Sequence, residues 1–129
     1  MAHILLVDDD PDVVAGNATA IETLGHSVSA SSNTAEAAEL VRREVPDLVV
    51  LEAFLDGGFS GIELARSLAE DYPNLPLIML TRADEHLTQE ELAQQDRDGG
   101  WIPVQRYLAK PVLTDVLAYE IEHLLPAAE

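Results

Sequence analysis

Short apolar runs alternate with amphipathic segments along the whole chain. A strand buried on both faces reads as an apolar run of roughly four to eight residues, because neither face meets water. We identify five candidate strands, and most of them end directly before a charged or hydroxyl residue. The predicted strands are His3–Val7, Ser27–Ser31, Leu48–Leu51, Leu77–Leu80 and Gln105–Ala109.

Between these runs, apolar residues recur every three or four positions, which is the period of an α-helix. In the first such segment, Val14, Ala18, Ile21 and Leu24 form a stripe, and a later helix is predicted at about Gln89–Asp96. Capping residues and helix breakers mark the ends. The predicted starts are Asp10-Pro11, Asn33 or Thr34, Ser60, Thr88 and Thr114, and the predicted stops are Gly25, Pro46, Pro73, Gly99 and Pro126.

A strand followed by a helix, repeated five times, predicts an α/β fold. Right-handed crossovers place helices on both faces of a parallel sheet. We therefore expect a five-stranded, doubly wound parallel sheet, (βα)5, in three αβα layers. A chain of 129 residues fits one domain, so we expect a single domain over residues 1–129.

Composition narrows the function classes. The chain has no cysteine, which excludes disulfides, thiolate metal sites and cysteine nucleophiles. It carries 24 acidic residues against 7 basic ones, a formal net charge of −17. Such a surface repels phosphate backbones, so direct nucleic-acid binding is not expected. Apolar runs stay short of a membrane span, and we expect a cytoplasmic protein without membrane contact.

Polar side chains gather where the predicted strands end. Asp8–Asp10 follow the first strand, Glu52 the third, Thr81 the fourth and Lys110 the fifth. In a doubly wound sheet, ligands bind outside the carboxyl ends of the strands. Converging carboxylates repel each other unless a cation lies between them, and oxygen ligands suit a hard ion such as Mg²⁺. A hydroxyl and an ammonium nearby are suited to phosphate oxygens, so the set predicts a metal-assisted phosphoryl site.

The segments LLVDDDPD, PDLVVLE, LIMLT and YLAKP, in that order, resemble the response-regulator receiver (CheY-like) family over almost the whole chain. The resemblance implies a fold of the flavodoxin-like, CheY-like type. It also implies a non-enzymatic module of two-component (phosphorelay) signal transduction. Its expected partner is a sensor histidine kinase or another signalling protein. Its expected cofactor is Mg²⁺.

The resemblance also implies a role for each matching position. Asp8 and Asp9 correspond to the acidic pair that binds Mg²⁺, and Glu52 occupies the position of the phosphoacceptor. The metal ligands would be Asp8, Asp9, Glu52 and the backbone carbonyl of Phe54. Thr81 and Tyr107 would be the switch residues, and Lys110 would contact the phosphoryl group. Pro111 would follow a cis peptide bond.

Three departures from the family pattern change the expected chemistry. The acceptor position carries Glu52 instead of aspartate, which moves the carboxylate about 1.5 Å further from the backbone. Because in-line transfer depends on position, we expect a pseudo-receiver that is not phosphorylated in the conventional way. Glu52 either pairs with Lys110, resembling an occupied site, or forms a dead site.

The second departure is the loop AFLDGGFSG, where Asp56 replaces a proline of the family pattern. This change weakens the assignment of the Phe54 carbonyl and leaves Asp56 as an alternative acceptor. The third is the long segment Arg82–Val104, whose role the sequence leaves open. It alters the face formed by the fourth helix, fifth strand and fifth helix, where we expect a dedicated partner or a homodimer.

Other interpretations remain open from the residues alone. Asp8–Asp10 also suit a plain acidic helix start. A phosphatase of the haloacid-dehalogenase type would use Asp8 as nucleophile and Asp10 as acid, but no acidic pair follows Lys110. A flavodoxin-like binding domain would need a phosphate loop, for which Asp8–Asp10 have the wrong charge. The four histidines show no pairing with each other or with acids, and they are predicted to be surface or edge residues: His3, His26, His86 and His123.

Overall fold

The computed structural model describes residues 2–55, 60–81, 104–110 and 112–125. Within these ranges it contains five strands and four helices. The strands are β1 His3–Val7, β2 Ser27–Ser31, β3 Leu48–Glu52, β4 Leu77–Thr81 and β5 Arg106–Ala109. The helices are α1 Pro11–Thr23, α2 Thr34–Arg43, α3 Ser60–Asp71 and α5 Thr114–Leu124. The predicted helix at Gln89–Asp96, with its cap Thr88, lies outside the described residues.

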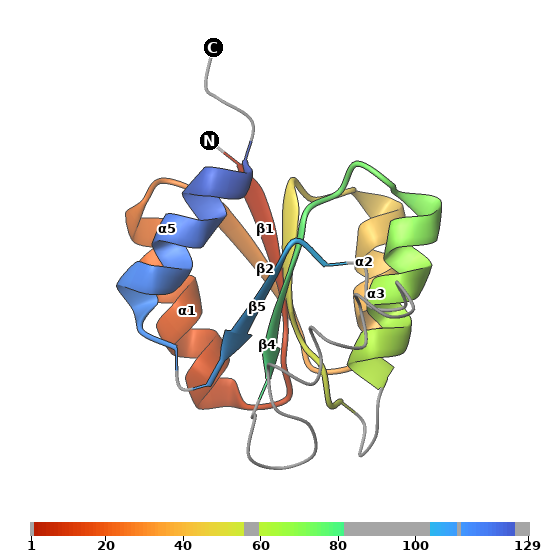
Figure 1. The fold of residues 1–129 in the computed structure, drawn as a ribbon, viewed down its shortest axis with the longest axis horizontal. Helices are drawn as coiled ribbons and strands as arrows, with labels where there is room; N and C mark the ends of the chain where they lie inside the picture. The colour runs from red at the N-terminus through yellow and green to blue at the C-terminus, as the bar shows by residue number, and fades with distance from the viewer. Residues whose placement is uncertain (1, 56–59, 82–103, 111, 126–129) are drawn as a thin grey trace.

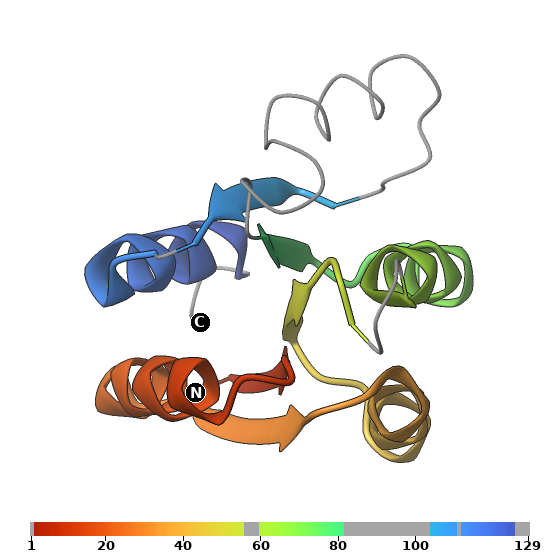
Figure 2. The same ribbon diagram turned by 90° about the horizontal axis from the view of Figure 1, so that it is seen from below.

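All five strands form one parallel sheet in the order β2-β1-β3-β4-β5. Figure 1 shows α1 and α5 on one face of this sheet and α2 and α3 on the other. Figure 2 shows the same three layers from below, with the strands stacked between the two pairs of helices. The predicted doubly wound α/β fold is therefore confirmed.

Alternation along the strands builds two separate cores. In β1, Leu5 and Val7 face the α2 and α3 side, while Ile4 and Leu6 face the α1 and α5 side. β3 and β4 alternate in the same way, so both faces of the central strands are apolar, as expected for a parallel sheet covered on both sides. The helix stripes complete the cores through Ala37, Val41, Ile62, Ala65 and Leu68 on one face and Ile21, Leu117 and Ile121 on the other.

Two of the predicted helix caps are confirmed. The Asp10 carboxylate accepts hydrogen bonds from the backbone N–H groups of Asp12 and Val13, and Pro11 is the first residue of α1. The Asn33 side chain accepts from the N–H of Glu36, which decides between Asn33 and Thr34 as the cap of α2. Each cap satisfies backbone donors that a helix start leaves without an intrahelical partner.

Two other cap predictions are wrong by one residue. Ser60 is already the first residue of α3. Thr114 is the first residue of α5, and its cap is Leu113, which makes no side-chain capping bond. The Leu113 carbonyl accepts from the N–H groups of Val116 and Leu117, so the backbone turn starts α5 without a polar cap.

The ends of other elements also differ from expectation. Gly25 stops α1 with φ 95°, but Leu24, predicted on the buried stripe, is 43% exposed because it lies beyond the last turn. Gln105 precedes β5 instead of starting it, and its side chain accepts a 2.7 Å hydrogen bond from the N–H of Leu77. The helices in the described part of the chain are too short or too polar to span a membrane.

Candidate functional site

The candidate site lies at the carboxyl edge of the sheet, where β1, β3 and β5 end. Asp8 follows β1, Glu52 is the last residue of β3, and Lys110 follows β5. β1 and β3 are neighbours, with Val7 opposite Leu51, so Asp8 and Glu52 emerge side by side. Lys110 comes from beyond β4, and its long side chain reaches both acids.

The three side chains form a buried ion triad. The Lys110 ammonium Nζ lies 2.6 Å from Asp8 Oδ2 and 2.5 Å from Glu52 Oε1. The exposed fractions of the side chains are 8% for Lys110, 6% for Asp8 and 4% for Glu52. The ion pair between Glu52 and Lys110, one of the two outcomes expected from the sequence, is therefore present.

The remaining carboxylate oxygens of the triad bind backbone donors. Asp8 Oδ1 accepts a 3.0 Å hydrogen bond from the N–H of Asp10, and Glu52 Oε2 accepts one of 3.0 Å from the N–H of Phe54. Each of the four oxygens thus has a donor. Buried charges persist in a protein interior only when they are paired and hydrogen-bonded in this way.

The electrostatics of Lys110 reflect two opposing effects. Burial of the ammonium favours its neutral form, but hydrogen bonds and attraction from Asp8 and Glu52 outweigh this and raise the pKa of Lys110 above its ordinary value of 10.5. Lys110 is therefore positively charged at neutral pH. The ammonium offsets one of the two negative charges of Asp8 and Glu52.

Helix α3 presses directly on the strand that carries Glu52. A Cβ atom added to Gly61 would lie 1.8 Å from the backbone oxygen of Glu52 and 2.7 Å from that of Ala53. Real atoms do not approach this closely, so only glycine permits the observed packing. The position of the Glu52 backbone therefore depends on the first turn of α3.

The geometry does not fit the magnesium site that the resemblance predicts. Of its four predicted ligands, Asp8 and Glu52 meet, but Lys110 lies between them, and Asp9 is exposed. Phe54 contributes its N–H to Glu52. Among the described residues, no group of three or more acidic or histidine side chains is arranged to hold a metal ion. In this arrangement the pocket holds an ammonium where a divalent ion was expected.

Several predicted site positions are described only in part. Thr81 ends β4 opposite Ala109, and Tyr107 lies in β5 opposite Met79, but the structure describes the backbone alone at both switch positions. Asp56, Pro111 and residues 82–103, which include His86, lie outside the described residues. Their assigned roles stay predictions.

The phosphatase alternative requires a nucleophile and an acid in the first loop. Asp8 is held by Lys110 and by the N–H of Asp10, and the Asp10 carboxylate caps α1. Both carboxylates are thus committed to contacts within the protein. This geometry gives the phosphatase assignment no support.

One polar contact, between His26 and Glu122, is not foreseen by any sequence pattern. His26 was expected to be unpaired, but its Nε2 lies 2.5 Å from Glu122 Oε1 on α5, and its Nδ1 accepts from the N–H of Ala2. The two residues lie 96 positions apart in the chain, and neither periodicity nor a local motif relates them. The contact ties the start of β2 to α5.

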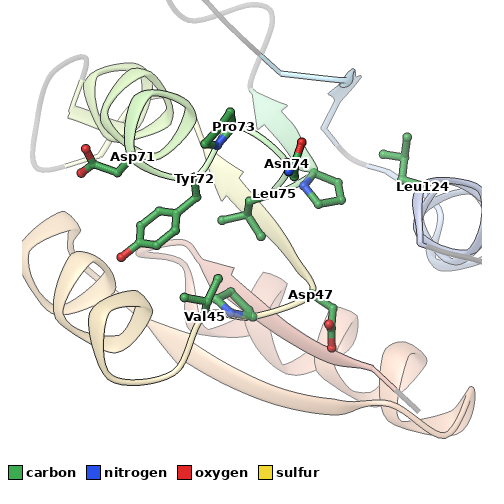
Figure 3. Close-up of a pocket in the computed structure, with 10 residues that line it drawn as sticks. Val45, Asp47, Asp71, Tyr72, Pro73, Asn74, Leu75 and Leu124 are labelled. Carbon is green, nitrogen blue, oxygen red and sulfur yellow. The ribbon is translucent and has the colours of Figure 1, made fainter.

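Two hollows of about 510 Å³ lie on opposite ends of the molecule. One borders the site between α1 and α2 and is lined by Asp8, Asp9, Val14, Ala30 and Glu36 among others. Figure 3 shows the other, lined from the loops before β3 and β4 and from the end of α5. The second hollow is at the amino ends of the strands and is separate from the candidate site.

The chain is similar in sequence and in fold to receiver domains of known proteins. Residues 4–122 match the model of the response regulator receiver domain. The chain is 30% identical to Protein PilH of Pseudomonas aeruginosa over 97% of this chain and 98% of that protein. It is 32% identical to the response regulator MprA of Mycobacterium leprae, covering 95% of this chain but 50% of that protein. A CheY-like receiver structure from Methanospirillum hungatei has TM-score 0.80 at 23% identity and shares the fold, covering 95% of this chain and 92% of that one.

Proposed function

The chain belongs to the response regulator receiver family of two-component signalling, and on that premise we propose that it is a pseudo-receiver, which signals by protein contact without conventional aspartate phosphorylation. In this proposal residues 1–129 act as one receiver domain, and Glu52 occupies the phosphoacceptor position. Thr81, Tyr107 and Lys110 are the corresponding switch and phosphate-contacting positions. No catalysed reaction is assigned to the chain.

One observation carries this proposal: the Glu52 carboxylate is buried and already bound at both oxygens. Oε1 pairs with Lys110 at 2.5 Å, and Oε2 accepts from the N–H of Phe54. A phosphoacceptor must present an oxygen in line with its donor, and displacement by about 1 Å costs roughly a hundredfold in rate. Glu52 carries one methylene more than aspartate, and its oxygens are turned inward to protein donors.

Protein contact then remains as the means of signalling. The expected partner is a sensor histidine kinase or another signalling protein. α5 and its cap residue expose three apolar side chains, Leu113, Val116 and Tyr119, with exposed fractions of 69%, 41% and 61%. These side chains support a contact, with a partner or a second copy of the chain, on the face that includes β5 and α5.

The proposal is tested by intact mass after incubation with acetyl phosphate and Mg²⁺. The wild-type protein is expected to gain no phosphoryl group. Glu52→Asp shortens the side chain by about 1.5 Å and is expected to gain one. Glu52→Gln, which keeps the length and removes the negative charge, is the matched control and is expected to gain none.

A phosphoryl group on the wild-type protein, mapped to any carboxylate, contradicts the proposal. A Glu52→Asp protein that folds but gains no phosphoryl group shows that the glutamate alone does not block phosphorylation, and the single-residue explanation then fails.

A further inference from the structure

The Lys110 ammonium lies where a bound cation would lie. Its Nζ is 2.6 Å from Asp8 Oδ2 and 2.5 Å from Glu52 Oε1. Protein oxygens surround Ca²⁺ at about 2.3–2.6 Å and Mg²⁺ at about 2.0–2.1 Å. The nitrogen therefore lies between the two carboxylates at the Ca²⁺ distance and roughly 0.5 Å beyond the Mg²⁺ distance.

We infer that Lys110, held by Asp8 and Glu52 together, serves as a built-in substitute for the divalent cation, so that the native pocket takes up no Mg²⁺ and becomes a divalent-ion site only when this ammonium is removed or, as in Glu52→Asp, released from its second carboxylate. The inference rests on the proposed function, because it takes Glu52 to stand at the acceptor position.

Hydrogen bonds of the two carboxylates also oppose the binding of a divalent ion in the pocket. A divalent ion entering the pocket would compete with Lys110 for Asp8 Oδ2 and Glu52 Oε1. Asp8 Oδ1 and Glu52 Oε2 are bound to the N–H groups of Asp10 and Phe54. Taking these oxygens as ligands would remove the acceptor from two half-buried backbone donors, which is unfavourable.

Only one side chain of this sequence carries an ammonium group that could take the place of the cation. Lys110 is the sole lysine, so no neighbouring ammonium can take its place. Its charge also repels an incoming divalent ion at a short distance in a buried site, where water screens poorly. Loss of that single charge leaves two adjacent buried carboxylates, the arrangement that favours cation uptake.

The first test is calorimetric titration with MgCl₂, together with thermal unfolding in MgCl₂ and in NaCl of matched ionic strength. The wild-type protein is expected to show no saturable binding and no stabilisation specific to Mg²⁺. Lys110→Met is expected to bind one ion saturably and to gain thermal stability with Mg²⁺ over NaCl of matched ionic strength. Arg43→Met is the matched control, because it removes one positive charge from an exposed pair with Glu39 and is expected to behave as wild type.

The second test needs no variant. Lys110 and the chain's amino terminus are the only amines, so an amine-reactive reagent followed by peptide mass mapping reports Lys110 directly. Lys110 is expected to react slowly, and at the same rate with and without Mg²⁺. If Mg²⁺ displaced the ammonium, labelling of Lys110 would accelerate.

Three results overturn the inference: saturable binding of one Mg²⁺ by the wild type, Mg²⁺-accelerated labelling of Lys110, or a Lys110→Met protein that stays unfolded or unresponsive at high Mg²⁺. A wild type that binds Mg²⁺ but gains no phosphoryl group defeats this inference and leaves the proposed function intact. A wild type that is phosphorylated defeats the proposed function instead.

Discussion

At the scale of single residues, Lys110 determines the chemistry of the pocket. Removing one partner from a buried ion pair typically costs about 3–5 kcal/mol, because the other charge is left without compensation. Here one ammonium compensates two carboxylates, Asp8 and Glu52, so its loss leaves both uncompensated. The stability of the folded protein therefore depends on the Lys110 side chain.

That dependence predicts a specific response to alkaline pH. Because the pKa of Lys110 is raised above 10.5 in the folded protein, its contribution to stability is complete below about pH 10.5 and lost as the pH rises through the folded value. Urea unfolding of wild type and Lys110→Met from pH 8 to about pH 12 measures it. The difference in unfolding free energy should be constant up to about pH 10.5 and then shrink.

The Lys110→Met variant is the control in this experiment, because all other titratable groups are common to the two proteins. Lys110 is the sole lysine, so a shrinking difference is assigned to it alone. A difference that begins to fall near pH 8 would mean that the pKa is lowered by burial, contrary to the ion triad.

At the scale of elements, α3 and β3 are joined through one glycine. The first turn of α3 lies so close to the end of β3 that Gly61 admits no Cβ atom. This contact positions the strand end that carries Glu52. The start of α3 also shows that cap residues assigned from residue type can be wrong by one position. Ser60 has the side chain of a cap, but it is already the first residue of the helix.

Gly61→Ala is expected to destabilise the protein by about 1–3 kcal/mol or more, because the added methyl group must push backbone atoms apart. Gly16→Ala in α1 is the matched control. Nothing lies within 4 Å of its Cβ position, so there the substitution should stabilise by about 0.5–1 kcal/mol. Urea unfolding compares the two variants, and equal effects would refute the close contact at Gly61.

At the scale of the whole molecule, charge and packing oppose each other. The two cores bury apolar side chains on both faces of the sheet, while the chain carries a formal net charge of −17. Self-repulsion of that size destabilises the compact state. Exposed pairs such as Arg106 with Glu120 offset little of it, since such pairs contribute at most about 1 kcal/mol.

Salt should therefore stabilise this protein. Raising NaCl from about 0.01 M to about 1 M shortens the screening length from roughly 30 Å to roughly 3 Å. We expect the unfolding temperature, measured by circular dichroism, to rise by on the order of 5 °C. NaCl is preferred to sulfate, which strengthens apolar burial by itself. An unfolding temperature that falls with NaCl would mean that attractive pairs outweigh the repulsion.

The sequence by itself determined the succession of strands and helices, because both periodicities are local. Leu48–Leu51 reads as a doubly buried strand without knowledge of its neighbours, and Asp10 and Asn33 announce helix starts by bonding within a few residues. It also determined which residue types reach the carboxyl edge, since each follows directly from the end of a strand.

Only the tertiary structure decided what those residues do to one another. Asp8 and Glu52 become neighbours because β1 pairs with β3, and Lys110 reaches them from beyond β4. The residue types alone fit a metal site, whereas the orientation of the carboxylates toward an ammonium comes from packing between distant segments. The pairing of His26 with Glu122 has the same origin. Side-chain contacts across the fold depend on strand order and register, which no short stretch of sequence encodes.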